Sequence, residues 1–146
     1  MLSEVHQGKL LQPLVRDITQ DRINLYARAS GDFNPIHVDE TFAANTPFGG
    51  TIAHGMLVLA YVSEMMTLAF GQSWISEGKL QARFKEAARP GDTVTIKGRI
   101  DSIKEDNGNW YADCTFECSN QRGAVIVAGQ ATVRLPTETR ITKNGS

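Results

Sequence analysis

The sequence predicts an α+β domain in which a curved antiparallel sheet wraps around one long central helix. Residues 52–69 are apolar around almost the whole helical circumference, whereas residues 79–135 alternate between apolar and polar side chains with a period of two. The first pattern is typical of a buried helix and the second of half-buried strands. Because short turns separate the strands, we expect one antiparallel sheet that packs against the helix.

The chain of 146 residues has the length of a single domain, which we place at residues 1–136 with a polar tail at 137–146. Its formal net charge of -1 and scattered basic residues do not suggest binding to nucleic acid or to an anionic membrane. No apolar run approaches the roughly 20 residues of a membrane span, and the first residues lack the pattern of a signal peptide. We therefore expect a cytoplasmic protein.

The first helix is predicted by its end signals. Thr19 is a suitable N-cap, Asp21 lies in the first turn and Gly31 is a suitable end. One face of this helix carries Ile23, Tyr26, Ala27 and Ser30. A Gly-rich connection at 48–51 then leads to the central helix, which would be about 25 Å long at 1.5 Å per residue.

Four strands are predicted after the central helix. The apolar positions are Leu80, Ala82 and Phe84 in the first, Val94, Ile96 and Ile100 in the second, Trp110, Ala112, Cys114, Phe116 and Cys118 in the third, and Val125, Val127, Ala131, Val133 and Leu135 in the fourth. The connections at 90–92, 106–108 and 120–123 have residues suited to hairpin turns.

Cys114 and Cys118 are the only cysteines. Four residues apart on one strand, they would lie about 13 Å from each other at roughly 3.3 Å per residue. A disulfide needs Cα atoms closer than about 7 Å. We therefore expect two free thiols that behave as small buried apolar side chains.

The chemistry is concentrated in residues 26–37, Tyr-Ala-Arg-Ala-Ser-Gly-Asp-Phe-Asn-Pro-Ile-His, where Asp32 and His37 follow the end of a helix. A carboxylate and an imidazole on one ordered loop can hold a water molecule and move its protons. Pro35 fixes its own φ and disfavours a helical conformation at Asn34, which stiffens the loop. The spacing predicts a general acid–base pair.

These residues resemble the signature of the MaoC-like, or hydratase 2, branch of the hotdog superfamily, which includes (R)-specific enoyl-CoA hydratases and dehydratases. The resemblance extends over about residues 19–135 and includes His-Val-Asp at 37–39, Phe-Ala at 42–43, Phe-Gly at 48–49, Ile-Ala-His-Gly-Met at 52–56 and Pro-Gly-Asp at 90–92. It implies a hotdog fold and the reversible addition of water to trans-2-enoyl thioesters of CoA or acyl carrier protein, without a cofactor.

The resemblance also implies the roles of three residues. Asp32 and His37 would bind the water that adds to the enoyl thioester. The backbone N–H of Gly55 would stabilise the negative charge on the thioester oxygen, since the N–H groups at a helix N-terminus are unpaired and glycine permits close approach.

Two further residues are candidates for orienting the site. The Ser63 hydroxyl, two helical turns beyond Gly55, would point toward the cavity and orient Asp32, or would instead bond back to its own helix. We expect Asn34 to structure its loop in preference to acting directly in catalysis, because asparagine readily bonds to nearby backbone.

His54 is expected to hold the loop, in preference to acting as a second base. Met56 belongs with Met65 and Met66 to the core or to the wall of an acyl tunnel. The cluster of Asp32, His37, Asp39 and His54 contains metal-ligating groups. Its spacing matches no helical His-x-x-x-His or thiolate pattern, and the resemblance implies no metal.

Two other functions remain open: a hotdog thioesterase, which binds similar ligands, and a non-catalytic subunit of a hetero-oligomeric dehydratase. The dyad at Asp32 and His37 favours the hydratase. The resemblance implies a homodimer with two sheets joined edge to edge, and an open sheet edge gives a physical reason for it. Acyl chain length and the carrier, CoA or acyl carrier protein, depend on cavity depth and on basic residues such as Lys79, Arg83, Lys85 and Arg89.

Overall fold

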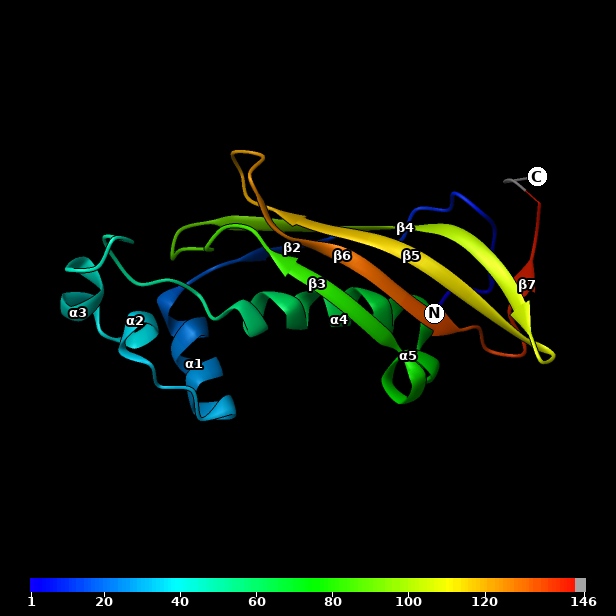
Figure 1. Cartoon of the computed structure of the whole chain (residues 1–146), viewed down its shortest axis with the longest axis horizontal. Coiled ribbons are helices and arrows are strands. Elements are labelled where there is room, and N and C mark those ends of the chain that lie inside the picture. The colour runs from blue at the N-terminus through cyan, green and yellow to red at the C-terminus, as the bar shows by residue number, and fades with distance from the viewer. Residues whose placement is uncertain (144–146) are drawn as a thin grey trace.

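The computed structural model describes residues 1–143, in which a five-stranded antiparallel sheet lies over one long helix (Figure 1). The sheet contains β2 (Leu14–Asp17), β3 (Lys79–Phe84), β4 (Thr93–Asp106), β5 (Asn109–Ser119) and β6 (Val125–Arg134), in the order β2-β4-β5-β6-β3. The helices are α1 (Gln20–Ser30), α2 (Pro35–Val38), α3 (Glu40–Ala44), α4 (Gly55–Phe70) and α5 (Gln72–Glu77). The predicted α+β architecture is confirmed.

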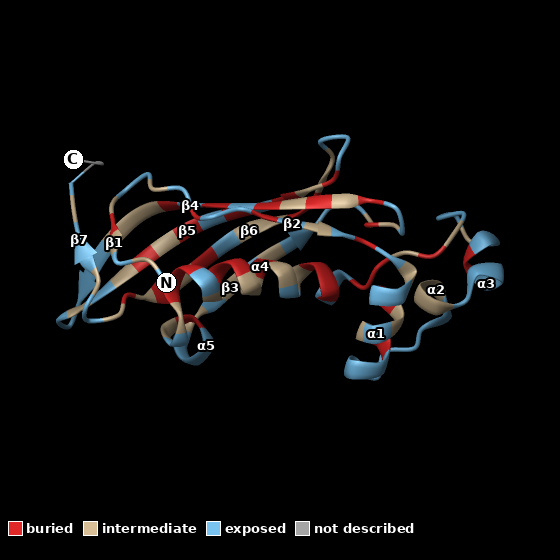
Figure 2. Ribbon diagram, turned by 180° about the vertical axis from the view of Figure 1, so that it is seen from behind, coloured by how far each residue is buried: buried red, intermediate tan, exposed pale blue. Residues whose placement is uncertain are grey.

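Only one side of the central helix α4 is buried, because the sheet covers it from one side (Figures 1 and 2). The buried positions are Leu57, Val58, Val62, Met65, Met66, Ala69 and Phe70. Met56 and Leu68, on the uncovered side, are 57% and 51% exposed. The expectation of an entirely buried helix is therefore wrong for the single chain. The helix begins at Gly55, as the role expected for its N–H requires, and before it the Ala53 N–H pairs with the Ala88 carbonyl.

The end signals of α1 act as predicted. The Thr19 side chain accepts a hydrogen bond from the Arg22 N–H at 3.1 Å, and Gly31 ends the helix with a left-handed φ of 79°. Ile23 and Ala27 are buried. In both views the three short helices α1, α2 and α3 lie together beyond the N-terminal end of α4 (Figures 1 and 2).

All four predicted strands are present, and two of the three predicted hairpins are correct. Asn107 and Gly108 both have positive φ and join β4 to β5, as a type I′ turn requires. Residues 120–123 join β5 to β6. The prediction of a hairpin at 90–92 is wrong, because β3 pairs with β6 and not with β4.

The 90–92 turn instead forms hydrogen bonds to the 120–123 turn and to the residues that precede α1. Asp92 is buried, and its carboxylate accepts hydrogen bonds from the Arg89 N–H and from Gln121 Nε2. Its carbonyl accepts from the Ile18 N–H at 2.8 Å, which attaches the turn to the start of α1. The Arg89 side chain in turn donates to the carbonyl of Phe48. The turn thus helps to place the segment that leads into α4.

Part of the segment that we expected to be a polar tail belongs to a second, two-stranded sheet. In this sheet β7 (Arg140–Ile141) runs parallel to β1 (Glu4–Val5). Arg140 Nη2 lies 2.6 Å from Glu4 Oε2, and this pairing lowers the pKa of the Glu4 carboxyl. Residues 144–146 of the expected tail lie outside the described residues.

Cys114 and Cys118 are free and buried, as predicted. Burial raises the pKa of each thiol to about 12. Because both thiols are therefore protonated near neutral pH, they are poor nucleophiles and poor metal ligands. They serve as small apolar side chains of the core.

Substitution of Gly129 by alanine tests the close pairing of β3 with β6. A Cβ at this position would lie 1.9 Å from the carbonyl oxygen of Gln81, so Gly129→Ala must push the two strands apart. We expect a loss of about 1–3 kcal/mol in the free energy of unfolding, the usual range for overpacking. Urea denaturation followed by circular dichroism measures it. Gln130→Ala, an exposed change on the same strand, is the control. Equal midpoints for Gly129→Ala and the native protein would contradict this packing.

Candidate active site

Asp32 lies in a loop whose shape is set by its own short polar side chains. The Asp32 N–H donates to Ser30 Oγ, and the Asp32 carboxylate accepts from the Asn34 N–H, each at 3.2 Å. Asn34 Oδ1 accepts from the Ile36 N–H at 3.1 Å and so caps α2, which begins at Pro35. Such side-chain-to-backbone bonds are the reason these residue types occur in turns. They leave the Asp32 side chain exposed.

His37 is held through both its backbone and its ring. Its carbonyl accepts a hydrogen bond from Gln20 Nε2 at 2.8 Å, and its ring Nδ1 lies 2.9 Å from the Ile52 carbonyl oxygen. A carbonyl oxygen can only accept, so Nδ1 carries the proton and donates it. In the neutral ring Nε2 then has a free lone pair and can act as a base.

His54 packs directly against this pair. Its Nε2 lies 2.9 Å from the Asp32 carbonyl oxygen, and its ring stacks on His37 with centroids 3.9 Å apart and planes 27° apart. The His54 ring also lies 4.8 Å from the Tyr26 ring, between centroids, at an angle of 58°. The ring is 2% exposed, and among the described residues its Nδ1 has no hydrogen-bond partner. The bond to Asp32 agrees with the expectation that His54 holds the loop.

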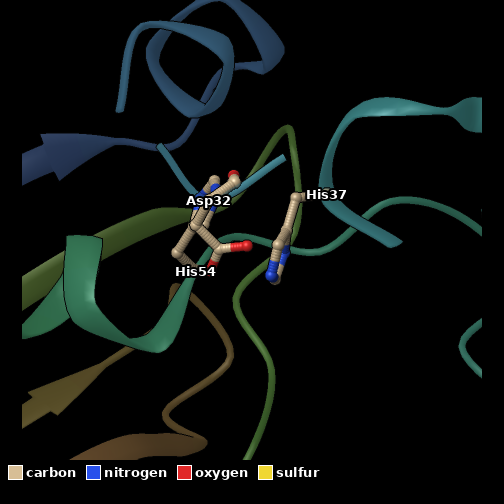
Figure 3. A group of neighbouring side chains, drawn as sticks. All are labelled: Asp32, His37 and His54. Carbon is tan, nitrogen blue, oxygen red and sulfur yellow. The ribbon is translucent and has the colours of Figure 1, made fainter. Parts of the chain in front are cut away.

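Asp32, His37 and His54 form one cluster, in which one ligand-type atom of each residue lies within 4.8 Å of the others. Figure 3 shows the Asp32 carboxylate directed toward the His37 ring. A carboxylate and two imidazoles also form a common metal-binding set. However, lone pairs lie in the planes of the rings, so stacked rings direct them side by side and not toward one point. This geometry suits proton transfer better than metal coordination.

Beside His37 opens a mostly apolar cleft of about 280 Å³. Its walls are His37, Phe48, Ile52, Ala53, Gly55, Val58, Phe84, Lys85, Glu86, Ala87, Ala88 and Ile126. Gly55 is the first residue of α4, and the His54 side chain makes no capping bond there. The first N–H groups of a helix lack acceptors within it and carry the positive end of its dipole. The cleft thus has an imidazole on one wall and a helix N-terminus on another.

The Phe84 ring lies close to Gly55. A Cβ at Gly55 would lie 2.9 Å from Cε1 of Phe84, so the ring, which belongs to a half-exposed side chain, would have to shift. Phe84 stands at the end of β3, and its ring therefore lies directly over the start of α4. No other residue type fits there unless the ring moves.

Ser63 and Met56 do not join this cluster. Ser63 Oγ accepts a hydrogen bond from Trp74 Nε1 at 2.9 Å, so its partner is on α5 and not at Asp32. Helix α5 folds back so that the buried Trp74 ring reaches this turn of α4, which helical spacing alone does not predict. Met56 is exposed and is not among the residues that line the cleft.

A chain of polar contacts that supports the His37 backbone was not predicted from the sequence. Gln20 Nε2 donates to the His37 carbonyl, and its Oε1 accepts from Thr51 Oγ1 at 2.7 Å. Thr51 is 4% exposed and also lies 3.2 Å from Glu40 Oε2. The three residues lie on separate segments, so no local pattern connects them.

Within residues 1–143, no helix is long and apolar enough to cross a membrane.

Comparison with known proteins agrees with the resemblance found in the sequence. A family model of the MaoC-like domain matches residues 2–109. The chain is 36% identical over 115 residues to the (R)-specific enoyl-CoA hydratase of Aeromonas caviae, a match that covers 76% of this chain and 81% of the relative. It is 30% identical over 130 residues to the 3-hydroxybutyryl-CoA dehydratase of Methylorubrum extorquens, covering 87% and 79%.

The fold is similar to that of R-hydratase PhaJ1 from Pseudomonas aeruginosa. The two structures superpose with a TM-score of 0.79 and 26% identity over 90% of this chain and 83% of the other. The predicted hotdog fold is therefore confirmed. The family match covers well over half of the chain, and the matched segment includes His37 and Gly55 of the cleft. The chain belongs to the MaoC-like domain family.

Proposed function

We propose that this protein is an (R)-specific enoyl-CoA hydratase, and in reverse an (R)-3-hydroxyacyl-CoA dehydratase. The observation that carries the proposal is the cleft itself, in which His37 and Gly55 stand on neighbouring walls with the Asp32 carboxylate beside His37. Several relatives are named for hydration or dehydration of acyl thioesters. The substrate would be a trans-2-enoyl thioester, and no cofactor is needed to balance the reaction.

Asp32 and His37 are assigned to the water. In hydration, the His37 Nε2 lone pair or the Asp32 carboxylate takes a proton from the water while its oxygen bonds to C3 of the enoyl group. The C2–C3 double bond becomes single, and the dyad returns a proton to C2 on the same face. Dehydration follows the same steps backwards. Well-placed acid–base groups of this kind typically contribute about 10²–10⁴-fold in rate.

Gly55 is assigned to the thioester. As oxygen adds to C3, negative charge develops on the thioester oxygen in the enolate. Gly55 lines the cleft at the start of α4, where its N–H would donate to this oxygen without reorganisation. The apolar walls exclude competing water, which strengthens the interaction.

Two copies of the chain would form a homodimer. The outer edge of β3 is unpaired, and the uncovered side of α4 exposes Met56 and Leu68. Both features are typical of surfaces that bind another chain. Multi-angle light scattering should give twice the mass of the chain, whereas the mass of a single chain would contradict this proposal.

Hydration of crotonyl-CoA is the direct test. We expect the absorbance of the conjugated enone to disappear without release of thiol. Free CoA would instead indicate a hotdog thioesterase. No turnover by the pure chain, with turnover only after a second subunit is added, would indicate a non-catalytic subunit.

Substitution of the dyad tests the roles of its members. Asp32→Asn and His37→Ala should each lower kcat by about 10²-fold or more, because each removes a proton-transfer group. Asp39→Asn is the matched control: it alters a nearby carboxylate that only caps α3 by accepting from the Phe42 N–H. Full hydratase rates in both dyad variants would disprove the mechanism.

Gly55→Ala tests the helix N-terminus. The backbone N–H remains in this variant, but the added methyl should hinder approach of the thioester oxygen to it. If the oxygen can no longer reach this N–H, kcat/KM should fall by about 10²-fold, the usual cost of losing one such interaction. The same methyl also clashes with Phe84, so Phe84→Ala and the double variant are measured alongside. If the double variant stays as slow as Gly55→Ala, the hindered approach to the residue 55 N–H is responsible. Recovery in the double variant would show that the clash alone caused the effect.

A further inference from the structure

We propose that His54 is a positioning residue for this reaction, in which a single imidazole holds both Asp32 and His37. This inference rests on the proposed function and assigns a role to a third residue of the site. It does not make His54 a proton-transfer group. Its support comes from three contacts of the ring and from the place of His54 in the chain.

The first contact attaches the Asp32 loop to the rest of the fold. Within the described part of the chain, the other hydrogen bonds of Asp32 run to Ser30 and Asn34, each only two residues away. Those bonds shape the loop but do not fix it relative to α4. The bond from His54 Nε2 to the Asp32 carbonyl spans 22 residues and does so.

The second contact sets the plane of the His37 ring. The bond between Nδ1 and the Ile52 carbonyl fixes one direction of that ring, but it still permits rotation about this direction. Stacking on His54, with centroids 3.9 Å apart, restricts that rotation. Together the two contacts hold the His37 ring beside the Asp32 carboxylate, as Figure 3 shows.

The third contact is with Tyr26 on α1. The Tyr26 ring lies 4.8 Å from the His54 ring at an angle of 58°, so His54 contacts two rings, Tyr26 and His37. Tyr26 is also the first residue of the signature at 26–37. This contact gives a reason for an aromatic residue six positions before Asp32.

Histidine is otherwise an unfavourable residue for the N-cap of α4, the position that His54 occupies. At an N-cap, Ser, Thr, Asp or Asn would bond to the helix backbone, whereas the His54 side chain makes no such bond. Its buried Nδ1 also lacks a partner among the described residues, which costs stability. Because Gly55 follows directly, however, His54 fixes the dyad relative to the N–H groups assigned to the thioester. The contacts of His54 with Asp32 and His37 thus account for a histidine at a position where it does not cap the helix.

Two substitutions separate the contacts. His54→Phe keeps a ring that can stack but loses the donor to Asp32. His54→Gln keeps an amide N–H the same number of bonds from Cα but loses the ring. We expect each to lower kcat for crotonyl-CoA about tenfold or more, as small misplacements of reacting groups do. KM should stay within about twofold, because a ring that is 2% exposed does not touch substrate.

The control substitution is made at His6, a histidine outside the site. His6→Gln removes a ring outside the cluster, which bonds only to the neighbouring Gln7 carbonyl, and should leave kcat unchanged. Unchanged kcat in both folded His54 variants would overturn the proposal. So would a rise in KM at constant kcat, since His54 would then be contacting substrate.

A measurement without substrate separates this proposal from the proposed function. Nitrogen-15 NMR of the histidine rings should show His54 as the Nε2–H tautomer and His37 as the Nδ1–H tautomer. The His37 ring signals should shift in His54→Gln more than in His54→Phe. The opposite tautomer at His54, or unshifted His37 signals in both variants, would refute the positioning role. If the native protein does not hydrate crotonyl-CoA, the proposed function fails while these signals still decide the contacts of His54.

Discussion

Burial of one side of α4 against the sheet is the constraint on which the site depends. The buried residues of this helix, from Leu57 to Phe70, contact the sheet along its length and determine where its first turn lies. That turn carries Gly55, and His54 precedes it. Since apolar burial is the main favourable term in folding, the packing of α4 on the sheet fixes the position of two residues of the site, His54 and Gly55.

The dyad is attached to this framework by polar contacts between separate segments. Short-range bonds give the loop around Asp32 its shape, and the bond to His54 gives it a place. His37 is held by Ile52 and Gln20 from two further segments. Loops that carry function commonly combine local structure with a rigid support in this way. Local bonds give this polar segment its shape, and long-range bonds fix the positions of Asp32 and His37, although the segment has no apolar core of its own.

Several parts of this fold follow from local patterns. The caps at Thr19 and Gly31, the alternation in β3 to β6 and the turn at 106–108 each depend on residues close together in sequence. The structure has them as predicted, except that Phe84 and Trp110, expected on the apolar faces, are exposed. The pairing of Asp32 with His37 was also predicted from spacing, because a stiff loop of six residues leaves them little freedom to separate.

Other features were decided only by the tertiary structure. β2 has four residues, too few to show a pattern, and the turn at 90–92 looks like a hairpin until β3 pairs with β6. Ser63 bonds to Trp74 because α5 folds back onto α4, and Gln20 reaches His37 from another helix. The sequence by itself determined the α+β class, the core helix and the chemical groups of the site. The tertiary structure decided strand order, hydrogen-bond partners and the stacking of His54, because these depend on contacts between residues far apart in the chain.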